Sequence, residues 1–420
     1  MGNTFLDKVT KSVIHGYSMN INKKMIKSNI PKIRFNNFKA FWVEKRIADI
    51  VKISAGGDVD KERLKESGKY PVIANALANK GIVGFYDDYK VKAPAVTVTG
   101  RGDVGYAVAR HENFTPVVRL LTLQSENIDV DYLENQINSM RILNESTGVP
   151  QLTAPQLGNY KVYHPEIEEQ SAIGSLFRTL DDLLVSYKDN LANYQSLKAT
   201  MLSKMFPKDG QTVPEIRLNG FEEEWEKTTL EKSTDRVKSY SLSRDVETNK
   251  DTGIKYIHYG DIHLGKVSMI DDGNSIPYIK TDTKLSEFLQ QGDLIFADAS
   301  EDYKGIAEVA VIATALSEKI VAGLHTIAVR PYSIFDSIFL YYMFKTQTFR
   351  KYGYKVGTGM KVFGISPSNL MKYEFYYPDK KEQQVIGAYF SNLDNLINSH
   401  QEKISQLEIL KKKLLQDMFI

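Results

Sequence analysis

The chain has 420 residues, 42% of them apolar and 25% charged, so it is long enough for more than one domain with a substantial core. It contains no cysteine, which excludes disulfides, thiolate metal sites and cysteine nucleophiles and is typical of a reducing cytoplasm. The formal net charge of +2 does not by itself indicate nucleic-acid binding, since a basic DNA-binding module usually carries more positive charge. No uncharged apolar run reaches about 18 residues, so no membrane span is predicted.

Residues 1–37 are predicted to be a basic N-terminal extension and a lead-in to the first domain. Residues 1–34 hold seven lysines and arginines against one acid, Asp7. Such a segment can be a basic arm that touches phosphate or a solvated tail, and the tail is the commoner case.

Residues 38–160 are predicted to form a β-rich α/β domain. Residues 129–142 read as a helix. Short β-branched or aromatic runs punctuated by glycine predict strands within residues 70–76, 81–89, 93–100 and 105–111.

Residues 161–208 are predicted to be one long helix. Its seam residues step by four and three, as in a coiled coil, with no proline or glycine between the first and the last of them. At ~1.5 Å per residue the helix would be about 60 Å long. The seam consists of Leu180, Leu184, Tyr187, Leu191, Tyr194, Lys198, Met201 and Met205.

Residues 209–372 are predicted to form a second β-rich domain. A helix is expected over residues 334–352, with Asp336 near its start and Gly353 at its end. Strands are expected within residues 254–262, 292–299, 305–314 and 325–332.

Residues 373–420 are predicted to be a second long helix, because residues 378–419 repeat residues 165–206 without a gap. The seam recurs in the same register, which favours pairing of the two helices with each other over packing on separate cores. The residues expected at this helix interface are Leu180, Leu184, Leu191, Leu393, Ile397 and Ile404.

The repeat also includes the segments that lead into each domain. Pro31–Trp42 matches Pro214–Trp225, and these segments end at the only two tryptophans of the chain. Between the repeated ends the two halves diverge in length and sequence. A copied frame around unlike inserts suggests one architecture with a different specificity in each half.

Catalytic motifs are absent from the sequence. There is no Pro-Pro pair for a methyltransferase active site, and Val267 stands where a phosphate-binding loop needs Ser or Thr. His258 and His263 lack a third ligand, so no metal site is predicted. We expect no catalytic residue, no metal and no cofactor in this chain.

Cationic and aromatic side chains on glycine-rich turns are the remaining candidates for binding. The turn Thr99–Gly105 puts Arg101 between two strands, where a guanidinium can reach an anionic group or a base edge. For any one such turn, a solvated cation is the commoner case. The candidate DNA-binding residues are Lys80, Arg101, Tyr303, Lys304, Lys355 and Lys361.

The layout resembles the specificity subunit of type I restriction-modification systems. The resemblance covers nearly everything from Pro31 to the C-terminus, and three paired features carry it as a constellation. These features are the paired segments that end at Trp42 and Trp225, the Thr147-Gly148 and Thr358-Gly359 turns, and the Pro-x-x-x-Glu-Gln starts of both long helices.

The resemblance implies an α/β (α+β) fold with two similar target recognition domains related by pseudo-twofold symmetry. Two long antiparallel helices would join them as spacer and docking platform. Each domain would read one half of a bipartite site on double-stranded DNA. The implied partners are two methylation subunits, which bind S-adenosylmethionine and modify adenine, and two restriction subunits, which use ATP and Mg²⁺. The alternative function is a pseudosymmetric scaffold whose inserts bind protein, and salt-dependent, sequence-selective DNA binding would separate the two.

Overall fold

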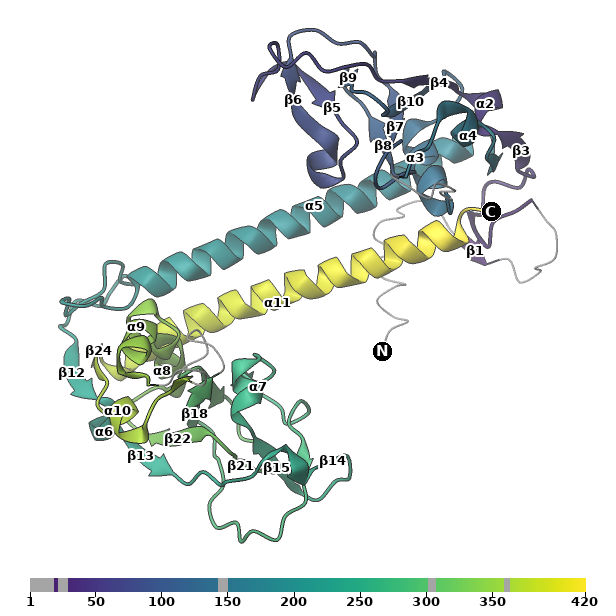
Figure 1. The fold of residues 1–420 in the computed structure, drawn as a ribbon. Helices are drawn as coiled ribbons and strands as arrows, with labels where there is room; N and C mark the ends of the chain where they lie inside the picture. Colours follow the sequence, from purple (N-terminus) through teal and green to yellow (C-terminus); the bar gives the residue numbers. More distant parts are fainter. Residues whose placement is uncertain (1–18, 22–28, 143–149, 301–306, 359–362) are drawn as a thin grey trace. The chain divides into compact units, whose positions relative to one another are not determined.

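The computed structural model describes residues 19–21, 29–142, 150–300, 307–358 and 363–420 (Figure 1). The chain forms two compact units: unit 1 holds residues 1–189 and 400–420, and unit 2 holds residues 190–399. Each unit therefore contains one insert together with a part of both long helices.

The long helices are α5 (Ile167–Lys204) and α11 (Lys380–Asp417), of 38 residues each. Glu168 and Glu169 lie in the first turn of α5, where negative charge is favourable next to the positive end of the helix dipole. No proline interrupts either helix, in agreement with the continuous seam that the sequence predicts.

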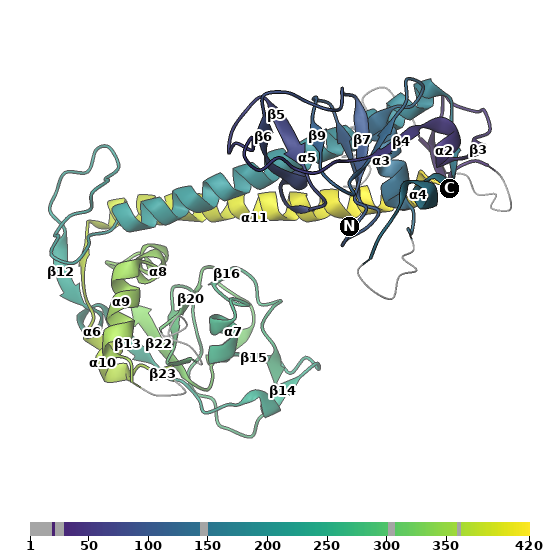
Figure 2. The ribbon, with the colours of Figure 1, turned by 45° about the horizontal axis from the view of Figure 1, so that its top comes forward.

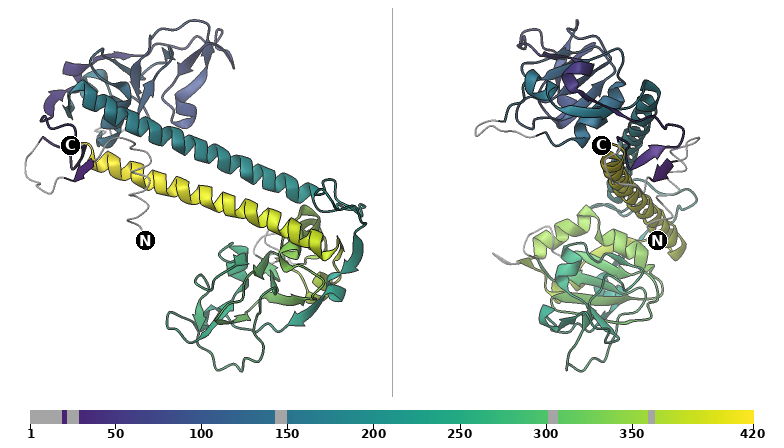
Figure 3. Two further views of the ribbon diagram at one scale, coloured as in Figure 1. Left: turned by 180° about the vertical axis from the view of Figure 1, so that it is seen from behind. Right: turned by 90° about the vertical axis from the view of Figure 1, so that its right-hand side faces the viewer.

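In unit 1 the two helices run in opposite directions side by side (Figures 1 and 3). Asp181 forms an ion pair with Lys411, and Lys188 pairs with Glu408 at 2.7 Å. The residue number rises along α5 while it falls along α11, so the pairing is antiparallel. Buried residues of both helices, with Leu180 and Leu414 among them, form one core cluster.

In unit 2 the antiparallel pairing continues through the other ends of the helices. Lys198 forms an ion pair with Asp394. Lys198 and Asp394 are the repeat equivalents of Lys411 and Asp181, so the same pair of positions serves both units with the roles of the helices exchanged. Phe206, just beyond α5, stacks on Phe390 of α11 with ring centroids 5.9 Å apart.

The C-terminal end of α11 completes the core of unit 1. The ring of Phe419 lies 5.7 Å from that of Phe177 and 5.6 Å from that of Tyr132. Phe206 holds the equivalent place in unit 2, next to Phe390 and Phe339. Each repeat thus supplies the aromatic side chain just beyond the end of its long helix to the unit built around the other repeat.

Unit 1 contains a four-stranded antiparallel sheet, a three-stranded sheet and two short ribbons. The sheet order is β4 (Lys52–Ala55), β10 (Leu121–Gln124), β7 (Ala95–Val98), β8 (Ala107–Arg110). The second sheet has the order β6 (Ile82–Tyr86), β5 (Tyr70–Ile73), β9 (Thr115–Pro116). The ribbons pair β3 (Val43–Arg46) with β11 (Lys161–His164) and β1 (Met19–Ile21) with β2 (Ile33–Phe35). The helical elements are α2 (Ile47–Ile50), η1 (Ala78–Gly81), α3 (Val130–Ser139) and α4 (Ala154–Gly158).

Unit 2 contains an equivalent sheet that is extended by one strand, β16, which is labelled in Figure 2. Its order is β13 (Thr234–Val237), β22 (Thr326–Pro331), β18 (Leu294–Ala297), β20 (Val309–Ile312), β16 (Met269–Ile270). A second sheet has the order β14 (Glu247–Thr248), β17 (Tyr278–Ile279), β15 (Ile254–Ile257), β21 (Lys319–Ala322). Two ribbons pair β12 (Glu226–Thr229) with β24 (Glu374–Tyr377) and β19 (Ala299–Ser300) with β23 (Phe363–Gly364). The helical elements are α6 (Leu230–Ser233), η2 (Arg244–Val246), α7 (Tyr259–His263), α8 (Ser337–Phe344), α9 (Gln347–Val356) and α10 (Pro367–Met371).

A buried ion pair anchors the lead-in segment of unit 1 to the start of α5. Both carboxylate oxygens of Glu169 accept hydrogen bonds at 2.6 Å from Arg34, and one also accepts from the indole N–H of Trp42 at 3.2 Å. In unit 2 the pair is Glu382 and Arg217, at 2.7 and 2.6 Å. A charge as buried as Glu169, at 1% exposure, is tolerable only with such a partner.

The glutamine that follows this glutamate joins the long helix to the next helix of the unit. Gln170 accepts a hydrogen bond from the N–H of Asp129, the N-cap of α3, and Gln383 accepts one from Asp336, the N-cap of α8. These contacts require a glycine in the long helix. A Cβ at Gly174 would lie 2.4 Å from Asp129 Oδ1 and 2.9 Å from a backbone nitrogen of α3.

The helix predicted over residues 334–352 is two helices, so that prediction is wrong in part. Asp336 caps α8 as expected, but Thr346 begins a second helix because its side chain accepts a hydrogen bond from the N–H of Phe349. Gly353 lies buried inside α9 and does not end the helix. Neither the cap at Thr346 nor the buried glycine is visible in the apolar periodicity.

Candidate nucleic-acid interface

The loop between β7 and β8 lies at one end of the central sheet of unit 1. The backbone N–H of Tyr106 donates to Thr99 Oγ1 at 3.0 Å, which closes the loop. Arg101 is exposed near its tip. Gly102 has φ +76°, a left-handed conformation that favours glycine, and it follows Arg101 directly. The loop therefore holds Arg101 on a closed turn.

Asn75 joins this loop to its neighbours. Its Oδ1 accepts a hydrogen bond from the N–H of Gly100 at 2.7 Å, and its Nδ2 donates to the carbonyl of Val118 at 3.0 Å. Lys80 follows on the same segment as Asn75, and its carbonyl accepts from Arg110 at 2.7 Å. Three segments thus form one connected surface, the loop edge of unit 1, which comprises residues 74–81, 99–105 and 117–120.

Arg119 belongs to this loop edge and has an unusual backbone. Its φ is +70°, although left-handed backbone costs a residue with a side chain on the order of 1–3 kcal/mol. The turn around it is fixed by a hydrogen bond from the N–H of Leu120 to the carbonyl of Val117 at 3.1 Å. The side chain of Arg119 is exposed. The fold thus maintains a strained conformation that presents a guanidinium.

Unit 2 presents an acid and a histidine at the equivalent end of its sheet. His325, at φ +55°, directly precedes β22 and lies 3.1 Å through Nδ1 from Asp298 Oδ1. Tyr259 of α7 contacts the His325 ring edge-to-face, with centroids 5.4 Å apart. Burial raises the pKa of the Asp298 carboxyl, and the charge of His325 opposes that rise. We call Asp298–Ser300, residues 323–326 and α7 the loop edge of unit 2.

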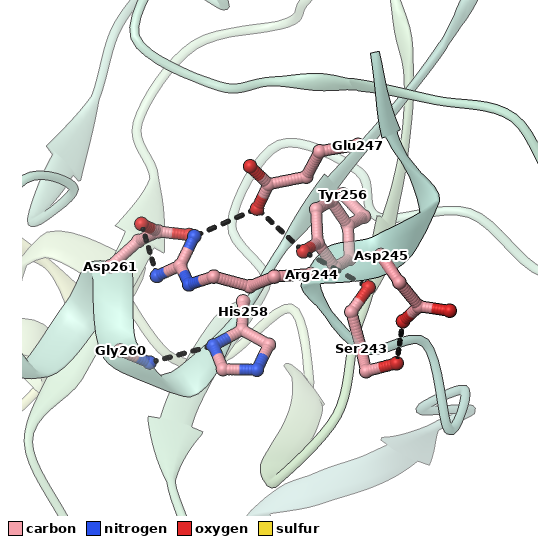
Figure 4. Close-up of polar contacts among 8 residues, drawn as sticks. All are labelled: Ser243, Arg244, Asp245, Glu247, Tyr256, His258, Gly260 and Asp261. Atoms are coloured by element: carbon pink, nitrogen blue, oxygen red, sulfur yellow. Dashed lines mark hydrogen bonds and ion pairs between the residues drawn. The ribbon is translucent and has the colours of Figure 1, made fainter.

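A second polar network of unit 2 surrounds Arg244 (Figure 4). Its guanidinium donates to Glu247 at 2.7 Å and to Asp261 at 2.9 Å. Tyr256 also donates to Glu247, at 2.7 Å. Although burial opposes the change, hydrogen bonds from Tyr256 and Arg244 lower the pKa of Glu247. Burial, then the charge of Arg244, lowers the pKa of His258. Because Arg244 is engaged by two carboxylates, the network braces the fold and leaves little of this guanidinium for a ligand.

The structure describes three of the six predicted DNA-binding residues. Lys80 and Arg101 belong to the loop edge of unit 1, and both are exposed. Lys355 is exposed on α9 in unit 2, outside the segments that make up the loop edge of that unit. The other predicted residues, Tyr303, Lys304 and Lys361, lie outside the described residues, as does the Thr147-Gly148 turn.

The predicted helix-interface residues contribute to packing within the chain. Leu180 and Leu184 are buried in the core cluster of unit 1, and Ile404 packs against it half-buried. Leu393 and Ile397 are buried in unit 2, and Leu191 is half-buried. Their role in docking another subunit stays a prediction.

Sequence reasoning missed Asn75, Arg119, Asp298 and His325 as members of the loop edges. Arg119 lies just before β10, a strand that the sequence did not predict, and His325 is the first residue of the strand expected over residues 325–332. Nothing in the sequence indicates the left-handed backbone of either residue. The side-chain bridge made by Asn75 joins residues 43 positions apart, which no local pattern reveals.

Among the described residues, no group of three or more histidine, aspartate or glutamate side chains could hold a metal ion. The helices of the described part also include none that is long and apolar enough to cross a membrane.

The fold matches a solved structure over almost its whole length. A crystal structure of the S subunit of a type I restriction-modification system from M. genitalium aligns with a TM-score of 0.64, at 16% identity, over 93% of this chain and 99% of that chain. This likeness confirms the predicted α/β (α+β) class with two domains and two long helices.

The family model for the type I restriction modification DNA specificity domain matches residues 39–193 and 222–409. The chain therefore belongs to the type I DNA specificity family. It is 27% identical over 143 residues to a proposed type I specificity subunit of Mycoplasma pneumoniae, and 21% identical over 279 residues to a type I restriction enzyme specificity subunit of Methanocaldococcus jannaschii. These matches cover 33% and 64% of this chain, and 39% and 64% of the two relatives, less than two thirds of either.

Proposed function

We propose that the chain is the sequence-specific DNA recognition subunit of a type I restriction-modification complex. Each insert reads one half of a bipartite target on double-stranded DNA. The long helices separate the two readers and dock the methylation and restriction subunits. The chain itself carries no catalytic site, no cofactor and no metal, and S-adenosylmethionine, ATP and Mg²⁺ are bound by the partner subunits.

One observation carries this proposal: the two units share a frame and differ at their loop edges. Glu169 and Glu382 make equivalent buried ion pairs in the two frames. By contrast, the loop edge of unit 1 presents Arg101 and Arg119, while that of unit 2 presents Asp298 and His325. Side chains of different donor and acceptor character on one scaffold suit the reading of two different base sequences.

The outer faces of the long helices support the docking role. Val185 and Ile409 in unit 1 are 54% and 62% exposed, and Val385 in unit 2 is 44% exposed. Apolar side chains exposed on helices that already pair with each other can pack against further helices of a partner. The modest net charge of +2 fits an assembly in which partners make many of the phosphate contacts.

Selection from a random duplex library tests the proposal. The full chain, produced with the methylation and restriction subunits of its system, should enrich two short motifs separated by a gap of constant length, and affinity should fall steeply with salt. The matched control is the same subunit mixture without this chain. Enrichment of no motif, together with selective capture of a protein by the inserts, would favour the scaffold function instead.

A further inference from the structure

We infer that Arg101, Arg119 and Arg141 are the specificity-determining residues by which unit 1 reads guanine in its half of the target. The inference rests on the proposed function and specifies its chemistry. Arg101 and Arg119 lie on the loop edge of unit 1. Arg141 is also exposed, and its neighbour Ile142 packs against Gly105 of the same edge, where an added Cβ would lie 2.8 Å away.

These three arginines differ from every other described arginine of unit 1. Their side chains make no hydrogen bond or ion pair with another residue of the described part of the chain. The remaining five are all engaged: Arg34 with Glu169, Arg46 with Asp49, Arg63 with Asp88, Arg110 with Thr97, and Arg178 with Asp131. The guanidinium groups without a partner therefore gather at one edge of the unit.

The backbone beneath two of these arginines is held rigidly. Gly100 accepts a hydrogen bond from the N–H of Leu152 at 2.9 Å, and it donates to Asn75. Asn75 also binds the carbonyl of Val118, next to Arg119. Asn75 is thus a positioning residue that sets the spacing between Arg101 and Arg119. Such preorganisation lowers the entropy lost when a side chain docks against a base.

Arginine at a rigid edge is best matched to guanine. A guanidinium donates two parallel hydrogen bonds to the O6 and N7 acceptors of guanine in the major groove, and this is the commonest specific contact between arginine and DNA. A solvated lysine on a flexible turn would serve phosphate equally well. The strained φ of Arg119 favours base reading, because phosphate contact does not require a costly local geometry.

Within the part of unit 2 that the structure describes, the loop edge offers no equivalent set of arginines. Among its described residues the charged pair is Asp298 with His325, and a carboxylate accepts hydrogen bonds from amino groups of cytosine or adenine. The described arginine of unit 2 that lacks a side-chain partner, Arg236, lines a groove with Glu231 and Asp235 on another part of the unit. Guanine reading by arginine is therefore expected in the half-site of unit 1.

Binding of the assembled complex to its selected target, with guanine replaced by 7-deazaguanine, tests this inference. The modified base lacks N7, so replacement in the half-site of unit 1 should weaken binding by about 5- to 150-fold per contacted guanine. Arg101→Ala, Arg119→Ala and Arg141→Ala should each lose preference for guanine at a position of that same half-site, because alanine has no donor for O6 and N7. Arg63→Ala, which changes an exposed arginine already paired with Asp88, is the matched control and should leave the motif unchanged.

The outcomes separate the inference from the proposed function. If the wild-type complex selects a bipartite motif but the three variants lose affinity equally for all sequences, the arginines contact phosphate and the inference is overturned. A half-site without guanine would overturn it too. If the wild-type complex selects no motif, the proposed function itself fails.

Discussion

The two units agree in their buried frames and differ at their loop edges. In both frames an arginine of the lead-in segment binds a buried glutamate, a glutamine binds the N-cap of the following helix, and a lysine–aspartate pair joins the long helices. At the edges, unit 1 has arginines whose side chains pair with no other described residue, whereas unit 2 has an Asp298–His325 pair. The difference lies where side chains face solvent.

This contrast has a physical cause. Removing one partner of a buried ion pair leaves an uncompensated charge, so the frame residues can change only together. An exposed arginine such as Arg101 meets no such constraint, because water solvates it whatever its neighbours are. The frame itself is not fully symmetric: the indole N–H of Trp42 donates to Glu169, whereas that of Trp225 is buried without a hydrogen-bond partner in the described part of the chain.

The two tryptophans also provide one fluorescent reporter for each unit. Trp42 and Trp225 are the only tryptophans of the chain, and both are buried. A Trp225→Phe chain reports the unfolding of unit 1, and a Trp42→Phe chain reports that of unit 2. The following stability predictions use these two chains as backgrounds.

The largest effect is expected from the exchanged helix ends. Deleting residues 418–420 removes two buried side chains, Met418 and Phe419, from the core of unit 1. The free energy of unfolding of unit 1 should fall by about 5 kcal/mol or more. Phe206 belongs to the repeat around which unit 1 is built, but its side chain packs in unit 2. Phe206→Ala should therefore lower the free energy of unfolding of unit 2 by about 3–5 kcal/mol. Urea unfolding followed by tryptophan fluorescence measures both changes. The exchange of helix ends between the units would be contradicted if the deletion destabilised unit 2 or if Phe206→Ala destabilised unit 1.

The buried glutamates should rank next. Glu169→Ala leaves Arg34 buried without its carboxylate and should cost unit 1 about 3–5 kcal/mol. Glu382→Ala should cost unit 2 less, because the Arg217 side chain is 17% exposed and the Arg34 side chain only 5%. Denaturant midpoints of the two units measure both changes, and the account fails here if Glu382→Ala proves the more damaging.

Glu134 should make the stability of unit 1 depend on pH. Burial, then the charge of Asp181, raises its pKa to about 7, while Lys411 opposes the shift. A carboxyl whose pKa is raised in the folded protein stabilises the folded state fully at pH values below its ordinary pKa of 4.5. This stabilisation is lost as the pH rises through about 7. Between pH 5 and 8 the unfolding free energy of unit 1 should fall by on the order of 2 kcal/mol.

Glu134→Gln is the control for this pH dependence and should flatten it. The equivalent position in unit 2 is Tyr341, whose pKa burial raises to about 12, so it does not titrate in this range. If the unfolding free energy of unit 1 fell equally with pH in the Glu134→Gln chain and in the chain that keeps Glu134, other groups would cause the pH dependence.

The smallest effect is expected in the two ribbons. Glu44 pairs with Lys161 at 2.9 Å in unit 1, and at the equivalent positions of unit 2 the signs are reversed, with Lys227 pairing with Glu374 at 2.8 Å. Glu44→Lys should slightly lower the unfolding midpoint of unit 1 at low salt and leave it unchanged at high salt. Adding Lys161→Glu should restore the midpoint, and a change that persists at high salt would have to come from something other than charge.

The sequence predicts most of the frame and little of the edges. Each seam consists mainly of apolar residues spaced by the helical period, and that period predicts that they are buried. Leu180 of one seam and Leu393 of the other do lie in buried cores. The apolar periodicity could not show which unit contains Phe419, because the same seam can pack against a parallel or an antiparallel helix. The direction of the pairing decides which unit the end of α11 reaches. Nor could it show the left-handed backbone of Arg119, which arises from hydrogen bonds between segments distant in the chain.

The most direct test of the account exchanges one insert and reads the target. Residues 43–160 would be replaced by the equivalent segment of another family member, with the frame residues Arg34, Trp42 and Glu169 retained. The DNA motif selected by the assembled complex would then be compared with that of the original chain. The account predicts that one half of the motif changes, while the other half and the gap between them stay the same. A change in both halves, or in neither, would contradict the claim that each unit reads its own half-site.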